Sequence, residues 1–295
     1  MRITGGMMIT TLLADLRRAQ ERLSTYQNQL ASGKRVQRPS DDPVAVVDSL
    51  RLRARIAEVE RMRQNAEEAR DWLEMTDSAL DRATQILQRA RELAVRAASG
   101  TLPDSSLEAL RAEVAELRDH LMEVANTTLG GTYLFGGFAT DRPPYVADPT
   151  SPTGVRYQGI TGNVEREVAP GVVMTVNVPG DQAFDGAFTV LSDLLTDLQN
   201  RDLAAVSANR VADLDRAIDR VLRFRAEVGA KVNRIELGLY RMDEIRIDTE
   251  RLLSGVEDAD IAETAMRLSV SEAAYRAALM AGARIVQPTL MDFLR

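Results

Sequence analysis

Cysteine is absent from the 295 residues, and histidine occurs once, as His120. The missing thiols exclude disulfides, thiolate metal sites and a cysteine nucleophile. A catalytic triad or a histidine-based metal site would depend on His120 alone, and we expect that side chain on the flank or surface of a helix. Metal sites built from carboxylates alone favour hard cations. We therefore expect no enzyme, no cofactor and no metal site.

Aromatic residues are scarce as well, at 4% of the chain. Few large rings are available to fill a broad core, which disfavours one compact globule. No run approaches the roughly 18 apolar residues of a membrane-spanning helix. The first residues, Met1 to Met8, lack the apolar run and cleavage site of a secretory signal peptide. The formal charge is −7 and there is no basic block, so we expect neither nucleic acid nor membrane as a partner.

Proline and glycine are concentrated in one segment. Six of the ten prolines and six of the 18 glycines lie between Asp141 and Val190. Within this segment, Val164–Val168 and Val172–Val178 alternate apolar and polar residues around Pro170-Gly171, as a β-hairpin does. The composition changes on both sides, which predicts a small inserted β-rich domain over residues 139–194.

Apolar residues recur with heptad spacing on both sides of the insert. Steps of 3 and 4 residues, sustained over several heptads, predict helices that pack along their length. Near the N-terminus the seam consists of Leu12, Leu16, Ala19, Leu23, Tyr26 and Leu30. Near the C-terminus it consists of Ile261, Ala265, Leu268, Glu272, Tyr275, Leu279, Gly282 and Val286.

The longest heptad pattern runs from Val59 to Ala97, and a similar one resumes after the insert, with Arg225 in one seam position. Asp42-Pro43 supplies a helix start, and Ser105 with Glu108 has the form of a capping box. The helix from Pro43 to about Ser99 would be roughly 80 Å long.

These patterns predict a mainly α fold, an elongated antiparallel helical bundle or coiled coil with discontinuous terminal helices and a small inserted β domain. The predicted terminal coiled-coil domain combines residues 1–42 with 256–295, and the helical rod combines 43–138 with 195–255. Each terminal helix offers one narrow seam, and an isolated contact of that size is marginal in water. We therefore expect both ends to be mobile in the monomer and to order when other copies surround them.

The segment Gly131 to Gly137 carries glycines at the spacing of a phosphate-binding loop. The required Lys-Ser/Thr is replaced by Gly137-Phe138, which argues against nucleotide binding. We interpret the segment as a turn into the insert, with Tyr133, Leu134 and Phe135 covering the end of the bundle.

Four segments of the sequence resemble a known family. Gln29-Leu-Ala-Ser-Gly-Lys-Arg-Val36 and Pro39-Ser-Asp-Asp-Pro43 look like the N-terminal segment of the flagellin superfamily. Thr132-Tyr-Leu-Phe-Gly-Gly137 and the ending Thr289-Leu-Met-Asp-Phe-Leu-Arg295 resemble the hook–filament junction branch, the hook-associated protein 3 family. The chain departs from the family in its high arginine content and in Gly5-Gly6 near the N-terminus. The insert contains few motifs that resemble the family.

The resemblance implies a structural, extracellular subunit of the bacterial flagellum, exported by a type III route without a cleaved signal peptide. It also implies as partners further copies of the same chain in a ring, a hook-side hook-associated protein, flagellin and an export chaperone. A minor flagellin and a coiled-coil protein of another secretion system remain as alternatives. The expected assembly interface comprises Leu12, Leu16, Leu23, Tyr26, Leu30, Lys34, Arg35, Asp41, Asp42, Ile261, Leu268, Tyr275, Leu279, Val286, Leu290 and Phe293.

Overall fold

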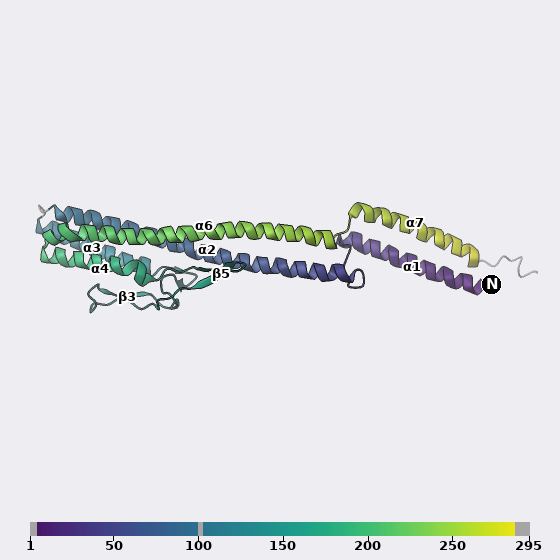
Figure 1. Cartoon of the computed structure of the whole chain (residues 1–295), viewed down its shortest axis with the longest axis horizontal. Coiled ribbons are helices and arrows are strands. Elements are labelled where there is room, and N and C mark those ends of the chain that lie inside the picture. The colour runs from purple at the N-terminus through teal and green to yellow at the C-terminus, as the bar shows by residue number, and fades with distance from the viewer. Residues whose placement is uncertain (1–4, 100–102, 287–295) are drawn as a thin grey trace, which may run out of the picture. The chain divides into compact units, whose positions relative to one another are not determined.

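The computed structural model describes residues 5–99 and 103–286, most of them helical (Figure 1). The chain forms two compact units. One contains Met1–Glu58 with Ile245–Arg295, and the other contains Val59–Glu244. Two long helices run through both units, α2 (Pro43–Ala98) and α6 (Val211–Glu257). Among the described helices, none is long and apolar enough to cross a membrane.

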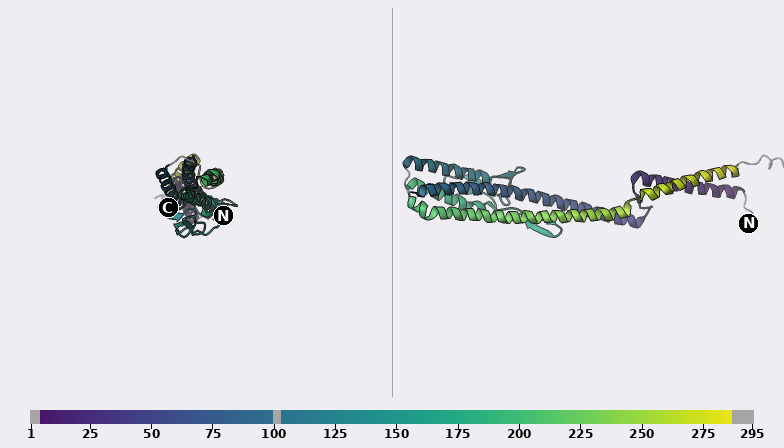
Figure 2. Two further views of the ribbon diagram at one scale, coloured as in Figure 1. Left: turned by 90° about the vertical axis from the view of Figure 1, so that its left-hand side faces the viewer. Right: turned by 90° about the horizontal axis from the view of Figure 1, so that it is seen from above.

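The larger unit is a bundle of helices. Parts of α2 and α6 are joined there by α3 (Asp104–Ala125) and α4 (Gly180–Asn200), which pack against each other (Figures 1 and 2). The link from α4 to α6 consists of α5 (Leu203–Ala205) and the π-helical turn η1 (Val206–Arg210). The prediction of a mainly α fold with a small β insert is confirmed.

The heptad pattern along α2 marks its buried side. Val59 begins the line and Ala97 ends it, and every member between them is buried except Met62, which is half-buried. Many members are alanine, so each contributes little buried area and the stability of the packing accumulates over the length of the helix. On α6, the matching line includes Leu214, Val221 and Val228, all fully buried.

Ion pairs between α2 and α6 show their antiparallel alignment. Arg91 Nε lies 2.5 Å from Asp215 Oδ1. Arg225, the charged residue in a predicted seam position, reaches Asp77 at 3.1 Å and Asp81 at 2.7 Å. These groups are partly exposed and each pair adds little stability by itself. Their cross-helix positions nevertheless explain how the seam accommodates an arginine.

Three separate antiparallel pairs of strands lie between α3 and α4, one just before the predicted insert and two within it. The strands are β1 (Thr128–Leu129) with β2 (Thr132–Tyr133), β3 (Tyr145–Ala147) with β4 (Val155–Tyr157), and β5 (Glu165–Ala169) with β6 (Val172–Thr175). The β5–β6 hairpin turns at Pro170-Gly171, as predicted. Gly171 has a φ of +71°, a conformation that glycine adopts without steric cost.

An aromatic cluster attaches the insert to α4. The ring centroids of Phe135 and Phe184 are 4.8 Å apart, as are those of Tyr145 and Phe188. The hydroxyl of Tyr145 lies 2.9 Å from the Gly180 carbonyl oxygen, and burial raises the pKa of this hydroxyl far above its ordinary value. Five of the 13 aromatic residues gather at this place, namely Phe135, Tyr145, Tyr157, Phe184 and Phe188.

Two local predictions differ from the structure. The helix α3 begins at Asp104, with Pro103 in the extended conformation before it and no side-chain cap, so the predicted capping box of Ser105 and Glu108 is wrong. The fixed φ of proline suits the position directly before a helix. In the insert, α4 begins at Gly180, inside the range 139–194 that we predicted as β-rich.

The smaller unit contains the terminal helices. The helices α1 (Gly5–Ser32) and α7 (Ile261–Val286) lie side by side and run antiparallel (Figures 1 and 2). The first turns of α2 and the last turns of α6 complete this unit. It carries every described residue of the expected assembly interface.

Candidate assembly surface

The predicted seam of α1 lies against α7. Its members are more covered than the residues around them, and Ala19 is fully buried. The half-buried members are Leu12, Leu16, Leu23, Tyr26 and Leu30. A contact between two helices covers one stripe of each, so partial burial is what a single partner can supply.

The contact line on α7 differs from the predicted seam. Four members of the predicted seam are covered, namely Leu268, Glu272, Tyr275 and Gly282, and the other covered residues are Thr264, Ser271 and Ala278. Ile261 and Leu279, which the heptad pattern places in the seam, are 51% and 45% exposed and lie off this contact line, and their place in the assembly interface stays a prediction. A Cβ on Gly282 would lie 2.8 Å from Leu12 Cδ2, which shows how closely the helices approach. Close approach selects small residues over large apolar ones.

The opposite face of α7 is apolar and exposed. Met266, Val270 and Met280 are 64%, 70% and 65% exposed. At 100° per residue Met280 lies on the side away from the α1 contact, and Met266 and Val270 lead from that side round to the groove beside α1. The charged side chains between the two faces pair with each other along the helix, as Glu263 does with Arg267. Unlike α1, whose outer side carries Thr10, Arg17, Glu21 and Asn28, this helix is apolar on two sides.

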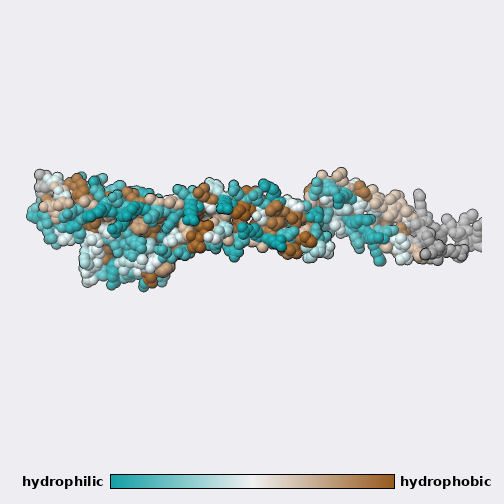
Figure 3. Space-filling model, in the orientation of Figure 1, coloured by the Kyte–Doolittle hydropathy of each residue, from teal (hydrophilic) through white to brown (hydrophobic). Residues whose placement is uncertain are grey.

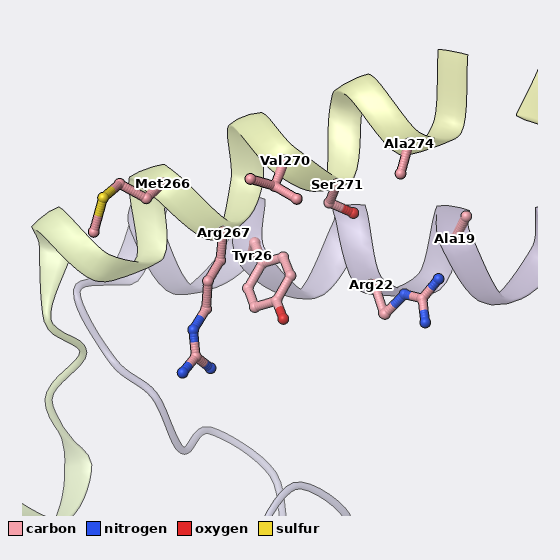
Figure 4. A pocket seen from close by; sticks show the side chains of 8 residues that line it. All are labelled: Ala19, Arg22, Tyr26, Met266, Arg267, Val270, Ser271 and Ala274. Carbon is pink, nitrogen blue, oxygen red and sulfur yellow. The ribbon is translucent and has the colours of Figure 1, made fainter. Parts of the chain in front are cut away.

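A groove of about 390 Å³ runs between the two helices. Figure 4 shows Tyr26 of α1 beside Arg267 of α7, with Met266 and Val270 along the edge. The groove is lined by Ala19, Arg22, Tyr26, Met266, Arg267, Val270, Ser271 and Ala274. Hydrophobic residues also form brown patches within the hydrophilic surface over α2 and α6 (Figure 3). The groove itself is shaped to receive apolar side chains.

The loop after α1 is held by its own aspartates. Asp42 Oδ1 accepts hydrogen bonds from the amides of Val44 at 3.1 Å and Ala45 at 3.0 Å, so Asp42 is the N-cap of α2 as predicted. Asp41 accepts from the amides of Arg38 and Gln37, at 2.9 and 3.2 Å. The hydrogen bond from the Arg38 amide, followed by that from the Gln37 amide, lowers the pKa of Asp41.

Two cations meet a buried carboxylate where this loop passes the end of α6. Glu257 is only 4% exposed. Lys34 Nζ lies 2.9 Å from Glu257 Oε2, and Arg53 Nη2 lies 2.7 Å from Glu257 Oε1. Burial acts to raise the pKa of Glu257, but the hydrogen bonds and charges of Arg53 and Lys34 outweigh it and lower the pKa. The carboxylate is therefore ionised at neutral pH.

Sequence reasoning named Lys34 and missed Glu257 and Arg53. The separations of 223 and 204 residues along the chain exceed any local motif. One signal was available, because Lys34 is one of only two lysines in the sequence. A cation at a loop that contacts a helix C-terminus has a favourable place beside the negative end of the helix dipole.

The remaining expected interface residues lie in three places. Arg35 is in the loop, where Nη2 donates to the Val256 carbonyl oxygen at 2.9 Å. Val286 is the last residue of α7. Leu290 and Phe293 lie outside the described residues. Within the described part of the chain, no three acidic or histidine side chains gather as metal ligands would, and His120 is exposed.

Comparison with known proteins identifies relatives with this arrangement. A model of the bacterial flagellin N-terminal helical region matches residues 3–140. Flagellar hook-associated protein 3 of Escherichia coli K12 is 26% identical over 308 residues, which cover 94% of this chain and 96% of that protein. The chain is a relative of flagellar hook-associated protein 3. The resemblance inferred from the sequence is thereby confirmed.

Flagellins are related too. The flagellin of Listeria innocua is 27% identical over 84% of this chain and 82% of that protein. The crystal structure of the flagellar junction protein FlgL from Legionella pneumophila matches with a TM-score of 0.59 and 15% identity, over 73% of this chain and all of that one. This second likeness shows a shared fold.

Proposed function

We propose that this chain is a structural subunit of the bacterial flagellum that joins the hook side to the flagellin filament. The observation that carries the proposal is the match to hook-associated protein 3 over nearly the full length of both proteins. The match to flagellin covers less of each chain, which favours the junction role over that of a filament subunit. The role is structural and not catalytic.

The terminal helices support a role in assembly. The pair α1 and α7 buries one seam between its members and leaves Met266, Val270 and Met280 in water. A helix that is apolar on two sides is normally covered on both. In a ring of identical subunits, the second side of α7 and the groove beside Tyr26 become buried against neighbouring copies. Assembly thus completes the burial that the monomer leaves unfinished.

The proposed junction role implies a route of export from the cell and a set of binding partners. An export chaperone binds the subunit before export. The subunit then reaches the growing tip through the type III export path and is extracellular once assembled. Its neighbours are other copies of itself, the hook-associated protein on the hook side, and flagellin on the filament side. Helices that are only marginally stable alone suit export in an incompletely folded form.

The decisive test is deletion of the gene, followed by electron microscopy of the cells and an assay of flagellin in the medium. We expect bare hooks together with shed flagellin, because filament subunits are made but have no junction on which to polymerise. Complementation with the wild-type gene restores the filaments. Normal filaments in the deletion strain contradict an essential junction role.

The flagellin alternative makes a different prediction about the purified protein. A filament subunit polymerises with itself without limit, whereas a junction subunit stops at a short ring. Concentrated wild-type protein, examined by negative-stain electron microscopy with a flagellin preparation as the positive control, should form no long filaments. Filaments many rings long favour the minor flagellin.

A further inference from the structure

Two separate connections join the terminal helix pair to the long helices. The first is the loop from Gly33 to Asp42, between α1 and α2. The second is the short segment of Asp258 to Asp260, between α6 and α7. Because α1 and α7 reach the long helices only through these connections, whatever holds the two connections together also holds the helix pair.

Backbone hydrogen bonds tie the two connections to each other. The amides of Arg35 and Val36 donate to the Glu257 carbonyl oxygen, at 2.6 and 3.3 Å. In the other direction, the amide of Ala259 donates to the Gly33 carbonyl oxygen at 2.9 Å. The loop thereby supplies partners for the last carbonyls of α6, which a helix leaves unpaired at its C-terminus.

The side chain of Glu257 lies at the centre of this contact. It is buried at the C-terminal end of a 47-residue helix, where the helix dipole disfavours a negative charge. Lys34 approaches from the first connection and Arg53 from the third turn of α2, each with a nitrogen within 3 Å of a Glu257 carboxylate oxygen. Removing either cation leaves the other, whereas removing the carboxylate removes both ion pairs at once.

We propose that Glu257 is a positioning residue, whose negative charge locks both connections and the start of α2 together and so holds α1 and α7 in one orientation on the ends of α2 and α6. We call this set, Glu257 with Lys34 and Arg53 and the backbone bonds of Gly33, Arg35, Val36 and Ala259, the Glu257 clasp. The inference goes beyond the proposed function, because it concerns the isolated chain and is tested without a flagellum.

The clasp depends on charge, and two substitutions separate charge from packing. Glu257→Gln keeps the size of the side chain and removes its charge, and Glu257→Asp keeps the charge and removes one methylene. The readout is amide hydrogen exchange at Val36 and Ala259, whose N–H groups donate across the clasp. We expect Glu257→Gln to accelerate exchange about 10- to 100-fold, since hydrogen bonds to charged groups are the strong ones, and Glu257→Asp to accelerate it less.

Orientation is measured by distances between spin labels, which the absence of cysteine makes straightforward. Labels at Ala54→Cys on α2 and Ser269→Cys on α7 report how the helix pair is held, and labels at Ser24→Cys and Ser269→Cys report the α1–α7 contact alone. All three positions are exposed. In Glu257→Gln, the first distance distribution should broaden and the second should stay as in the unsubstituted chain.

The matched control is Glu263→Gln, which removes an exposed glutamate paired with Arg267 in the same unit. It should change neither exchange at the clasp nor the distances. Unchanged exchange in α3 and α4 shows that each variant is folded. If Glu257→Gln cannot be purified, Lys34→Gln takes its place and should give a smaller acceleration of the same amides. The proposal is overturned if exchange at Val36 and Ala259 is unchanged in Glu257→Gln, or if Glu257→Asp is the more disruptive of the two.

Discussion

Single residues at the connection between the terminal and long helices have roles that their local sequence only partly predicts. Asp42 was expected as a helix cap and is one, because an aspartate directly before a proline is a local signal. The partners of Glu257 were unpredictable, since Lys34 and Arg53 are brought to it by the path of the whole chain. A helix cap can be predicted from neighbouring residues in the sequence, whereas an ion pair between residues about 200 positions apart cannot.

The backbone conformation just after the end of α1 requires glycine. Gly33 has a φ of +71°, and a Cβ there would meet nothing within 4 Å. Gly33→Ala should therefore destabilise the end of α1 by about 1 kcal/mol through backbone strain alone. Hydrogen exchange of the Gly33 amide, which donates to the Gln29 carbonyl oxygen at 2.8 Å, measures this change.

Gly255→Ala is the matched control for that substitution. Gly255 lies inside α6, and a Cβ there also meets nothing within 4 Å, but its φ is not positive. Alanine at this position should stabilise the helix by up to about 1 kcal/mol. Equal effects of the two substitutions would contradict the assignment of strain to Gly33.

Acid should open the Glu257 clasp. The pKa of Glu257 is lowered below its ordinary value of 4.5 by Arg53 and Lys34, which outweigh the opposing effect of burial. The folded chain thus binds a proton less readily than the unfolded chain, so the stabilisation is complete at neutral pH and is lost as the pH falls through the lowered pKa. The distance between labels on Ala54→Cys and Ser269→Cys, followed from about pH 6 to about pH 3, should broaden below about pH 4.5.

The same titration in Glu257→Gln isolates this carboxylate from the others that protonate in the range. The groups that pair with Glu257 are the side chains of Lys34 and Arg53. Because the variant has no carboxylate there, its distances should be broad at every pH and show no transition. A transition of equal size in both proteins would assign the effect to other carboxylates.

At the scale of elements, helix patterns predict which side of a helix is buried only when one side is apolar. On α1 the predicted seam is the covered stripe, and the apolar residues off it, such as Met7 and Leu13, are exposed. On α7 apolar residues occupy two sides, and the pattern of large residues selected Ile261 and Leu279 instead of Thr264 and Ser271. The close contact between α1 and α7 involves small residues, and a search for large apolar residues does not detect them.

The terminal helices should exchange faster than the bundle in the dilute monomer. Most seam residues of α1 and α7 are half-exposed, whereas α4 buries Phe184, Phe188 and Leu191 almost completely. Fewer buried contacts permit local opening at a lower free energy. Hydrogen exchange followed by mass spectrometry on the wild-type monomer should give weak protection in Gly5–Ser32 and Ile261–Val286 and strong protection in α4. Strong protection at both ends would contradict the expectation that they order on assembly.

At the scale of the whole molecule, the length of α2 was predicted well, from Pro43 to Ala98, because capping signals bracket an uninterrupted heptad pattern. The helix α4 was missed in part. Gly180 and Gly186 made its first turns look like part of the insert, and the packing of Phe184 on Phe135 that holds this helix comes from the tertiary fold. The proline and glycine content predicted where the insert lies. Its C-terminal boundary depends on the packing of α4, which the composition does not indicate.

Two substitutions distinguish the contact within one chain from contacts between chains. Leu23 is half-buried against α7, so Leu23→Asp should weaken the helix pair in the monomer and also prevent incorporation into the flagellum. Leu279 is 45% exposed and lies off the α1 contact line, so Leu279→Asp should leave the monomer unchanged and still prevent incorporation. Circular dichroism of the purified proteins measures the first effect, and complementation of the deletion strain, scored by filaments in electron micrographs, measures the second.

The matched control places the same charge on the hydrophilic side of α1. Ser24 is exposed beside Leu23, and Ser24→Asp should change neither the helicity nor the filaments, because Ser24 is a polar residue that is in contact with water in the monomer. Normal filaments with Leu279→Asp would mean that the outer side of α7 is not buried between subunits. Loss of filaments with Leu279→Asp but not with Ser24→Asp would assign the second apolar side of α7 to contacts between copies, because the two variants carry the same added charge on adjacent helices.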